Sequence, residues 1–152
     1  MPVLATGYIY AFVALLTVSS ILISSFSAYA ATLRTIPEIE QLRNVLEHVA
    51  TKGYELAALT AKTNSTSQAV LRLPSAIGAK QYWIGLRGDL SKTWVEGALG
   101  PIRRGNVNNR VYLPNPISAI GNYSSSRGPA VLECRMNGST IILDLRTWRT
   151  NP

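Results

Sequence analysis

The first 33 residues contain no Asp, Glu, Lys, Arg or His, and the first charged residue of the chain is Arg34. The chain also has a single cysteine, Cys134, and a single histidine, His48. One cysteine excludes an internal disulfide framework, and these two residues together fall short of the four ligands of a typical structural zinc site. We expect His48 to be a solvated surface residue. The sequence therefore predicts no enzyme and no cofactor.

The charged residues are distributed unevenly. Basic and acidic residues balance over 34–64, so the whole net charge of +7 lies after residue 64. An uncharged stretch, a neutral stretch and a basic remainder exclude a single soluble globule. Spread basic charge can attract nucleic acid or anionic lipid. No recognition helix or RNA-binding motif accompanies it, so we expect no nucleic-acid partner.

The uncharged stretch predicts a long apolar helix. Roughly 20 apolar residues span a bilayer, and this run is about ten residues longer. It is apolar on all sides and must be surrounded by lipid or by protein. Its Ser, Thr and Ala residues permit close approach of helices, which favours packing against copies of itself. The side chains expected at such contacts are Val3, Leu4, Tyr8, Ile9, Phe12, Leu15, Leu16, Ile21, Leu22, Ile23, Phe26 and Tyr29.

A secretory signal and a single-span membrane anchor are two other interpretations of this stretch. A secretory signal has a basic start and an apolar core of about 7–15 residues, which does not fit here. A single-span membrane anchor usually has basic flanks on its cytoplasmic side, and this N-terminus has none. The missing flank indicates that a charged leader before Met1 has been removed or was never recorded. The simple anchor stays open as an alternative.

Residues 34–64 predict an amphipathic continuation of the helix. Apolar residues recur at steps of three and four, and Arg43 with Glu47 forms an i,i+4 pair on the other side. Pro37 interrupts the register, and Thr35 begins a capping-box pattern. Either a new helix starts at Thr35 or one helix kinks near Pro37; we favour one long rod, kinked or briefly melted at about residues 32–36. The apolar stripe comprises Ile39, Leu42, Val45, Leu46, Val49, Gly53 and Leu56.

The remainder, residues 65–152, predicts short strands separated by turns. An Asn137-Gly138 pair between two strand-like runs is typical of a hairpin with a type I′ turn. About seven short strands suit an immunoglobulin-like antiparallel β-sandwich. The fold class is therefore α+β, with a helical rod over 1–64 and a sandwich over 65–152. The expected strands are 69–73, 81–87, 93–96, 110–113, 118–123, 130–136 and 140–145.

Three Asn-x-Ser/Thr sequons begin at Asn64, Asn122 and Asn137. All lie outside the apolar stretch, at a junction, a strand end and a hairpin tip, where a glycan can be accommodated. We treat them as candidate N-glycosylation sites of an extracellular protein.

The layout resembles that of archaeal type IV pilins. Pro2-Val3-Leu4-Ala5-Thr6 is similar to a segment near the start of many mature archaeal pilins, and the run from Leu73 to Gly78 followed by Tyr82-Trp83-Ile84 is similar to a segment of pilin-like heads. Bacterial pilins usually carry Phe at the first mature position and Glu at the fifth, where this chain has Met1 and Ala5. The resemblance is therefore to the archaeal class.

The resemblance implies a structural subunit of an extracellular archaeal type IV pilus. In that family the apolar helices pack into a filament core, and the β-sandwich heads form the outer surface used in adhesion. The implied partners are copies of the same chain in a helical filament, the membrane before assembly, and the pilus assembly machinery. The alternative is a membrane-anchored β-sandwich binding protein, such as a stator component associated with a pilus or archaellum.

Overall fold

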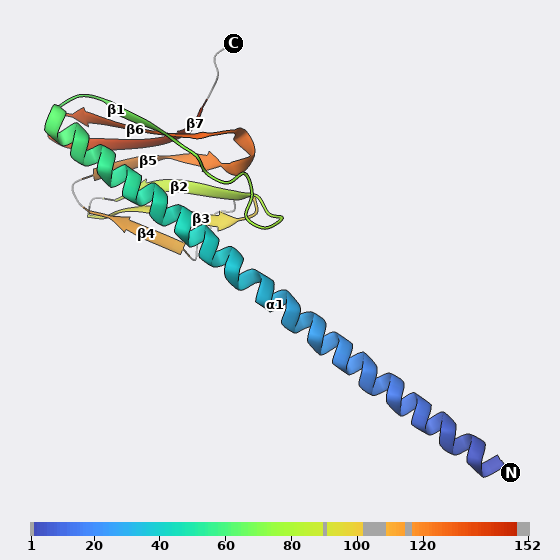
Figure 1. Cartoon of the computed structure of the whole chain (residues 1–152). Helices are drawn as coiled ribbons and strands as arrows, with labels where there is room; N and C mark the ends of the chain where they lie inside the picture. The colour runs from blue at the N-terminus through green and yellow to red at the C-terminus, as the bar shows by residue number, and fades with distance from the viewer. Residues whose placement is uncertain (1, 90, 102–108, 115–116, 149–152) are drawn as a thin grey trace. The chain divides into compact units, whose positions relative to one another are not determined.

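The computed structural model describes residues 2–89, 91–101, 109–114 and 117–148, without the side chains of residues 2–6, 34 and 35. One long helix precedes seven strands, so the α+β class is confirmed (Figure 1). Met1, Asn115, Pro116 and the end of the chain from Arg149 lie outside the described residues. The elements are α1 (Pro2–Thr63), β1 (Ser67–Leu71), β2 (Tyr82–Gly88), β3 (Thr93–Leu99), β4 (Asn109–Leu113), β5 (Ile117–Ser124), the 3₁₀ turn η1 (Ser125–Arg127), β6 (Ala130–Asn137) and β7 (Thr140–Thr147).

The helix α1 runs without interruption through Pro37. A new helix beginning at Thr35, or a melt before Pro37, is therefore wrong, and one continuous helix is correct. A proline inside a helix removes one backbone hydrogen bond and crowds the carbonyl group of residue i−4, which a long helix can tolerate by bending. The expected kink at Pro37 stays a prediction. Packing divides the chain at this residue into an N-terminal unit, 1–37, and a C-terminal unit, 38–152.

The part of α1 in the C-terminal unit is amphipathic and buries one side. Leu42, Leu46 and Val49 are at most 2% exposed, whereas Ile39 is 47% exposed. The buried stripe therefore begins one turn later than the sequence pattern predicts. On the solvated side the Arg43 Nε lies 3.0 Å from the Glu47 Oε1, as expected. This burial pattern makes the helix one wall of the core.

The seven strands form one mixed sheet in the order β1-β6-β7-β5-β2-β3-β4. Six of the expected strands overlap the observed ones with ends shifted by one to three residues, and β6 is extended by one. The expectation of an entirely antiparallel arrangement is wrong, because β5 and β7 are parallel. The β6–β7 hairpin places β7 in the gap between β5 and β6, so β7 runs in the direction of β5.

The immunoglobulin-like sandwich is not confirmed, since all seven strands hydrogen-bond within this one sheet. The covering layer is instead the helix: the cyan-to-green part of α1 lies along the sheet in Figure 1. Leu46 and Val49 share one core with side chains of every strand. The helix comes especially close at Gly53, where a Cβ would lie 2.7 Å from a methyl of Leu143. An amphipathic helix thus supplies the apolar layer that a second sheet supplies in a sandwich.

The β6–β7 hairpin is confirmed, but its turn differs from the expectation. Asn137 pairs with Thr140, so the two central residues are Gly138 and Ser139 rather than Asn137 and Gly138. Gly138 has a φ of +62°, and neither Asn137 nor Ser139 has a positive φ. Glycine at the first central position with a positive φ is the type II′ pattern, so type I′ is wrong. Both turns match the twist of the flanking strands, which explains why the hairpin itself was predictable.

Candidate functional site

The first candidate site is the surface of α1 over residues 7–33, here called the apolar helix surface. It carries no charged residue. Its large side chains are exposed on every side of the helix; Tyr8, Phe12 and Phe26, for example, are 75%, 63% and 77% exposed. At a rise of 1.5 Å per residue this segment is about 40 Å long, against about 30 Å for the hydrocarbon core of a bilayer. The helix is long and apolar enough to act as a membrane anchor.

The sequence-predicted contact residues are all on this surface where their side chains are described. Those of Val3 and Leu4 lie outside the described side chains. Because the exposed residues surround the helix, they form no single stripe that one neighbouring helix could cover. Burying them requires lipid or several protein neighbours. The remaining ten are Tyr8, Ile9, Phe12, Leu15, Leu16, Ile21, Leu22, Ile23, Phe26 and Tyr29, each more than half exposed.

Some hydroxyl groups in this surface donate hydrogen bonds to the helix backbone. The Thr17 hydroxyl donates to the carbonyl oxygens of Val13 at 2.9 Å and Ala14 at 2.8 Å. The Ser20 hydroxyl donates to the carbonyl oxygen of Leu16 at 2.8 Å. Such bonds let these two hydroxyl groups lie in an apolar environment without hydrogen bonds from water.

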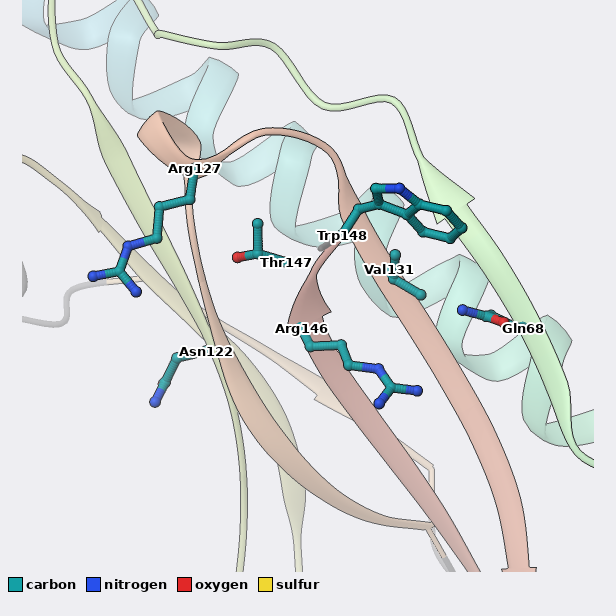
Figure 2. A pocket seen from close by; sticks show the side chains of 7 residues that line it. All are labelled: Gln68, Asn122, Arg127, Val131, Arg146, Thr147 and Trp148. Carbon is teal, nitrogen blue, oxygen red and sulfur yellow. The ribbon is translucent and has the colours of Figure 1, made fainter. Parts of the chain in front are cut away.

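The second candidate site is a hollow of about 660 Å³ on the face of the sheet opposite α1, here called the far face (Figure 2). Strand residues alternate between the two faces, and Leu132 and Leu145 point into the core while Val131 and Arg146, paired across β6 and β7, belong to the far face. The hollow is lined by Gln68, Asn122, Arg127, Val131, Arg146, Thr147 and Trp148.

Sequence reasoning did not find the hollow. Alternation along β5, β6 and β7 assigns residues to faces, but the order of strands in the sheet decides which of them meet. The parallel neighbour β7 brings Arg146 close to Asn122, and no local pattern predicted that pairing. Trp148 and Arg127 follow strand ends, where alternation gives no information.

The far face also carries an ionic and aromatic cluster over β2, β3 and β4. The Glu96 carboxylate receives a hydrogen bond of 2.9 Å from the Trp94 Nε1, and lies 3.5 Å from the Arg87 Nε and 3.6 Å from the Arg110 Nε. The Arg110 guanidinium lies 5.2 Å from the centre of the Trp94 ring. Glu96 is only 8% exposed, so the two arginines balance a charge held largely out of water. We interpret this cluster as a tie between three strands.

The three sequon asparagines are all exposed. Asn64 follows the end of α1 with a φ of +50°. Asn137 lies beside the hairpin turn, and Asn122 lies within β5, on the wall of the hollow. A glycan can reach each of them from solvent, and one on Asn122 would occupy the hollow.

Catalytic chemistry finds no support in the part of the chain that the structure describes. No group of three or more His, Cys, Asp or Glu side chains there could hold a metal ion. His48 is exposed on the solvated side of α1. Cys134 is buried, and burial raises the pKa of its thiol, which lowers the fraction of reactive thiolate.

Comparisons of the chain with protein families, curated proteins and solved structures find no match.

Proposed function

We propose that the chain is the structural subunit of an extracellular filament of the archaeal type IV pilus class. Polymerisation proceeds through the apolar helix surface, and the C-terminal unit forms the outer surface of the filament. The observation that carries the proposal is the uncharged helical segment over residues 7–33, whose large side chains are exposed on every side. Before assembly the same helix is held in the membrane, and the assembly machinery moves it from lipid to the filament.

The exposed side chains of the apolar helix surface must be buried against lipid or against other protein. Each large one gains roughly 1.5–3 kcal/mol when it leaves water, so the helix as a whole gains tens of kcal/mol. In the membrane, lipid already provides most of this gain. A filament provides it through identical neighbours stacked by a repeated heterologous contact, which surrounds each helix with several others. Exposed side chains around the whole helix are better explained by a filament, which surrounds the helix, than by a dimer, which would cover only one side of it.

A single-span membrane protein with a binding domain is the second candidate. The observation in its favour is that α1 is long and apolar enough to anchor the chain by itself. The two functions differ in what surrounds the helix in the mature state. The filament subunit has copies of itself there, and the anchored protein has lipid.

The test uses cells that make the chain together with its assembly machinery. Filaments sheared from these cells are expected to contain the chain as their repeating unit, as shown by mass spectrometry and electron microscopy. Ile23→Asp places a carboxylate at a position that is 67% exposed in the chain and buried in the filament. This variant is expected to lower the yield of sheared filaments at least tenfold.

The matched control is Asn44→Asp, which adds the same charge to the solvated side of α1 in the C-terminal unit. It is expected to leave the filament yield within twofold of the wild type. Filaments that form equally well with Ile23→Asp would contradict polymerisation through this helix. A chain recovered only from detergent-extracted membranes, with none in the sheared fraction, would favour the anchored protein.

A further inference from the structure

We propose that the hollow on the far face binds an acidic saccharide, with a carboxylate held at Arg127 and a sugar ring held against Trp148. Its biological setting rests on the proposed function, because a filament surface is what meets saccharides outside the cell. Binding itself depends on the C-terminal unit alone. The two proposals can therefore fail separately.

The shape of the hollow suits a small ligand. Its volume of about 660 Å³ lies in the range of about 300–1,000 Å³ that is usual for ligand sites. Figure 2 shows Arg127 and Asn122 on one side and Arg146, Trp148 and Gln68 on the other, with Thr147 between them. Val131 is 2% exposed and forms an apolar base. Such sites combine an apolar surface with a few polar groups that fix the orientation of the ligand.

The two arginines differ in the charge they offer. The Arg146 guanidinium forms an ion pair with the Glu133 carboxylate, so its positive charge is already balanced. Its remaining N–H groups can still donate hydrogen bonds to a ligand. Arg127 is exposed and has no hydrogen bond or ion pair within the part of the chain that the structure describes. A guanidinium presents a planar fork of donors that matches a carboxylate. Arg127 is therefore the group that selects an anionic ligand.

The remaining lining residues match a sugar. Trp148 is 45% exposed and presents an aromatic surface on which the apolar face of a pyranose can pack. The amide groups of Gln68 and Asn122 each offer donors and an acceptor, as the hydroxyl groups of a saccharide require. Trp148 is the one aromatic side chain among the described residues that line the hollow, so there is no row of aromatic rings on which successive nucleic-acid bases could stack. The combination favours a saccharide over a nucleic acid.

The segments that carry Arg127 and Trp148 are held in place by hydrogen bonds. The Tyr123 hydroxyl donates to the carbonyl oxygen of Gly128 at 2.9 Å, directly after Arg127. The backbone N–H of Trp148 donates to the carbonyl oxygen of Pro129 at 2.8 Å. These bonds tie the two sides of the hollow to the same short segment. A site with fixed walls loses less conformational entropy when a ligand binds.

Asn122 has two uses that exclude one another. It lines the hollow, and it is also the acceptor of a sequon, so a glycan attached there would compete with a free ligand. The binding test therefore uses the full chain in detergent from a host without N-glycosylation. Mass spectrometry verifies that Asn122 carries no sugar.

The test measures binding of trigalacturonate by isothermal titration calorimetry, with neutral maltotriose as the comparison ligand. The wild type is expected to bind trigalacturonate at least tenfold more tightly than maltotriose. Arg127→Gln and Trp148→Ala are each expected to weaken trigalacturonate binding at least tenfold. Both side chains are substantially exposed, so neither substitution removes core packing, and circular dichroism verifies that the variants fold.

Matched controls separate the hollow from the general basic surface. Arg72→Gln removes the same charge from an exposed position outside the hollow, and Tyr112→Ala removes an aromatic ring that is 58% exposed on the far face at β4. Both are expected to bind as the wild type does. Equal weakening by Arg72→Gln, equal affinity for maltotriose, or no binding at millimolar trigalacturonate would each overturn the proposal. Filament formation does not enter any of these measurements.

Discussion

At the scale of single residues, close backbone approach decides which side chains the sheet accepts. Gly121 in β5 has a φ of +126°, and a Cβ there would lie 2.1 Å from the carbonyl oxygen of Leu145 in β7. The parallel pair β5–β7 thus comes together at a position that only glycine can fill without strain. Leu145 is 1% exposed and belongs to the hydrophobic core, so a shift of β7 away from β5 would disturb core packing.

Gly121→Ala is therefore expected to lower the free energy of unfolding of the C-terminal unit by about 2–4 kcal/mol, from backbone strain and overpacking together. The measurement is urea denaturation of the full chain in detergent, followed by tryptophan fluorescence. Ser118→Ala, at an exposed position of the same strand, is expected to change stability by less than about 0.5 kcal/mol. Similar stabilities of the two variants would show that β5 and β7 are not this close.

A second residue, Tyr82, makes the C-terminal unit sensitive to high pH. It is fully buried, its hydroxyl donates to the carbonyl oxygen of Pro74 at 2.6 Å, and burial raises its pKa above the ordinary value of 10. The stabilisation is complete below pH 10 and is lost as the pH rises through the raised pKa. In this window the unfolded chain releases a proton that the folded chain retains.

The free energy of unfolding is therefore expected to fall between pH 10 and pH 11.5. Tyr82→Phe removes the ionisable group, so its stability is expected to fall less steeply over this range. At pH 8 the variant is expected to be less stable by about 1 kcal/mol, because the hydrogen bond is lost. Tyr54→Phe, an exposed control, should follow the wild type. A Tyr82→Phe profile parallel to that of the wild type would assign the alkaline loss to other groups.

At the scale of elements, α1 has two different surfaces in one helix. Over residues 7–33 it is exposed on every side, whereas after Pro37 it buries the stripe that begins at Leu42. Leu46 is fully buried. A Cβ added to Gly97 of β3 would lie 3.0 Å from one of the Leu46 methyl groups, so the helix and the strand are in close contact. The second half of the helix is thus part of the core rather than a connector.

Leu46→Ala is expected to lower the free energy of unfolding by about 3 kcal/mol, since it leaves a cavity between α1 and β3. Leu59→Ala removes the same atoms from a side chain that is 50% exposed, and its expected loss is below about 1 kcal/mol. Chemical denaturation of the full chain measures both. Equal losses would mean that the helix does not cover the sheet as described.

The sequence predicted the helix and the strands better than it predicted which strands pair with one another. Steps of three and four in α1, and turn residues such as Asn137-Gly138, are local signals, and the helix and all seven strands follow from them. The pairing partners of β7 (Thr140–Thr147) are not a local property of the sequence. One partner, β6, precedes β7 directly, but the other, β5, is separated from it in sequence by β6. The apolar helix surface was predictable from missing charge alone. The hollow was not, because it depends on that strand order.

At the scale of the whole molecule, the sheet depends on one strand. Without β7 the pair β1–β6 shares no strand-to-strand hydrogen bonding with the group β5-β2-β3-β4. The same strand contributes Leu143 and Leu145, both at most 1% exposed, to the core against α1. The strand therefore joins the two parts of the sheet and also fills the centre of the core.

A chain ending after Ser139 is expected to lose cooperative unfolding and its near-ultraviolet circular dichroism while retaining the helical signal of α1. Adding a synthetic peptide of residues 138–152 is expected to restore part of the near-ultraviolet signal, because the peptide fills the gap between β5 and β6. A truncated chain with the native spectrum and a cooperative transition would contradict the central role of β7.

The position of β7 also sets the order of events during synthesis. The ribosome makes α1 before any of the strands, so the apolar helix can enter a membrane while the strands are still being translated. Residues 140–147 are synthesised after every other strand. The seven-stranded sheet therefore cannot form until β7 is available to pair with β5 and β6. A nascent or prematurely terminated chain therefore presents an open sheet to proteases. Only chains complete to that point can therefore form the seven-stranded sheet.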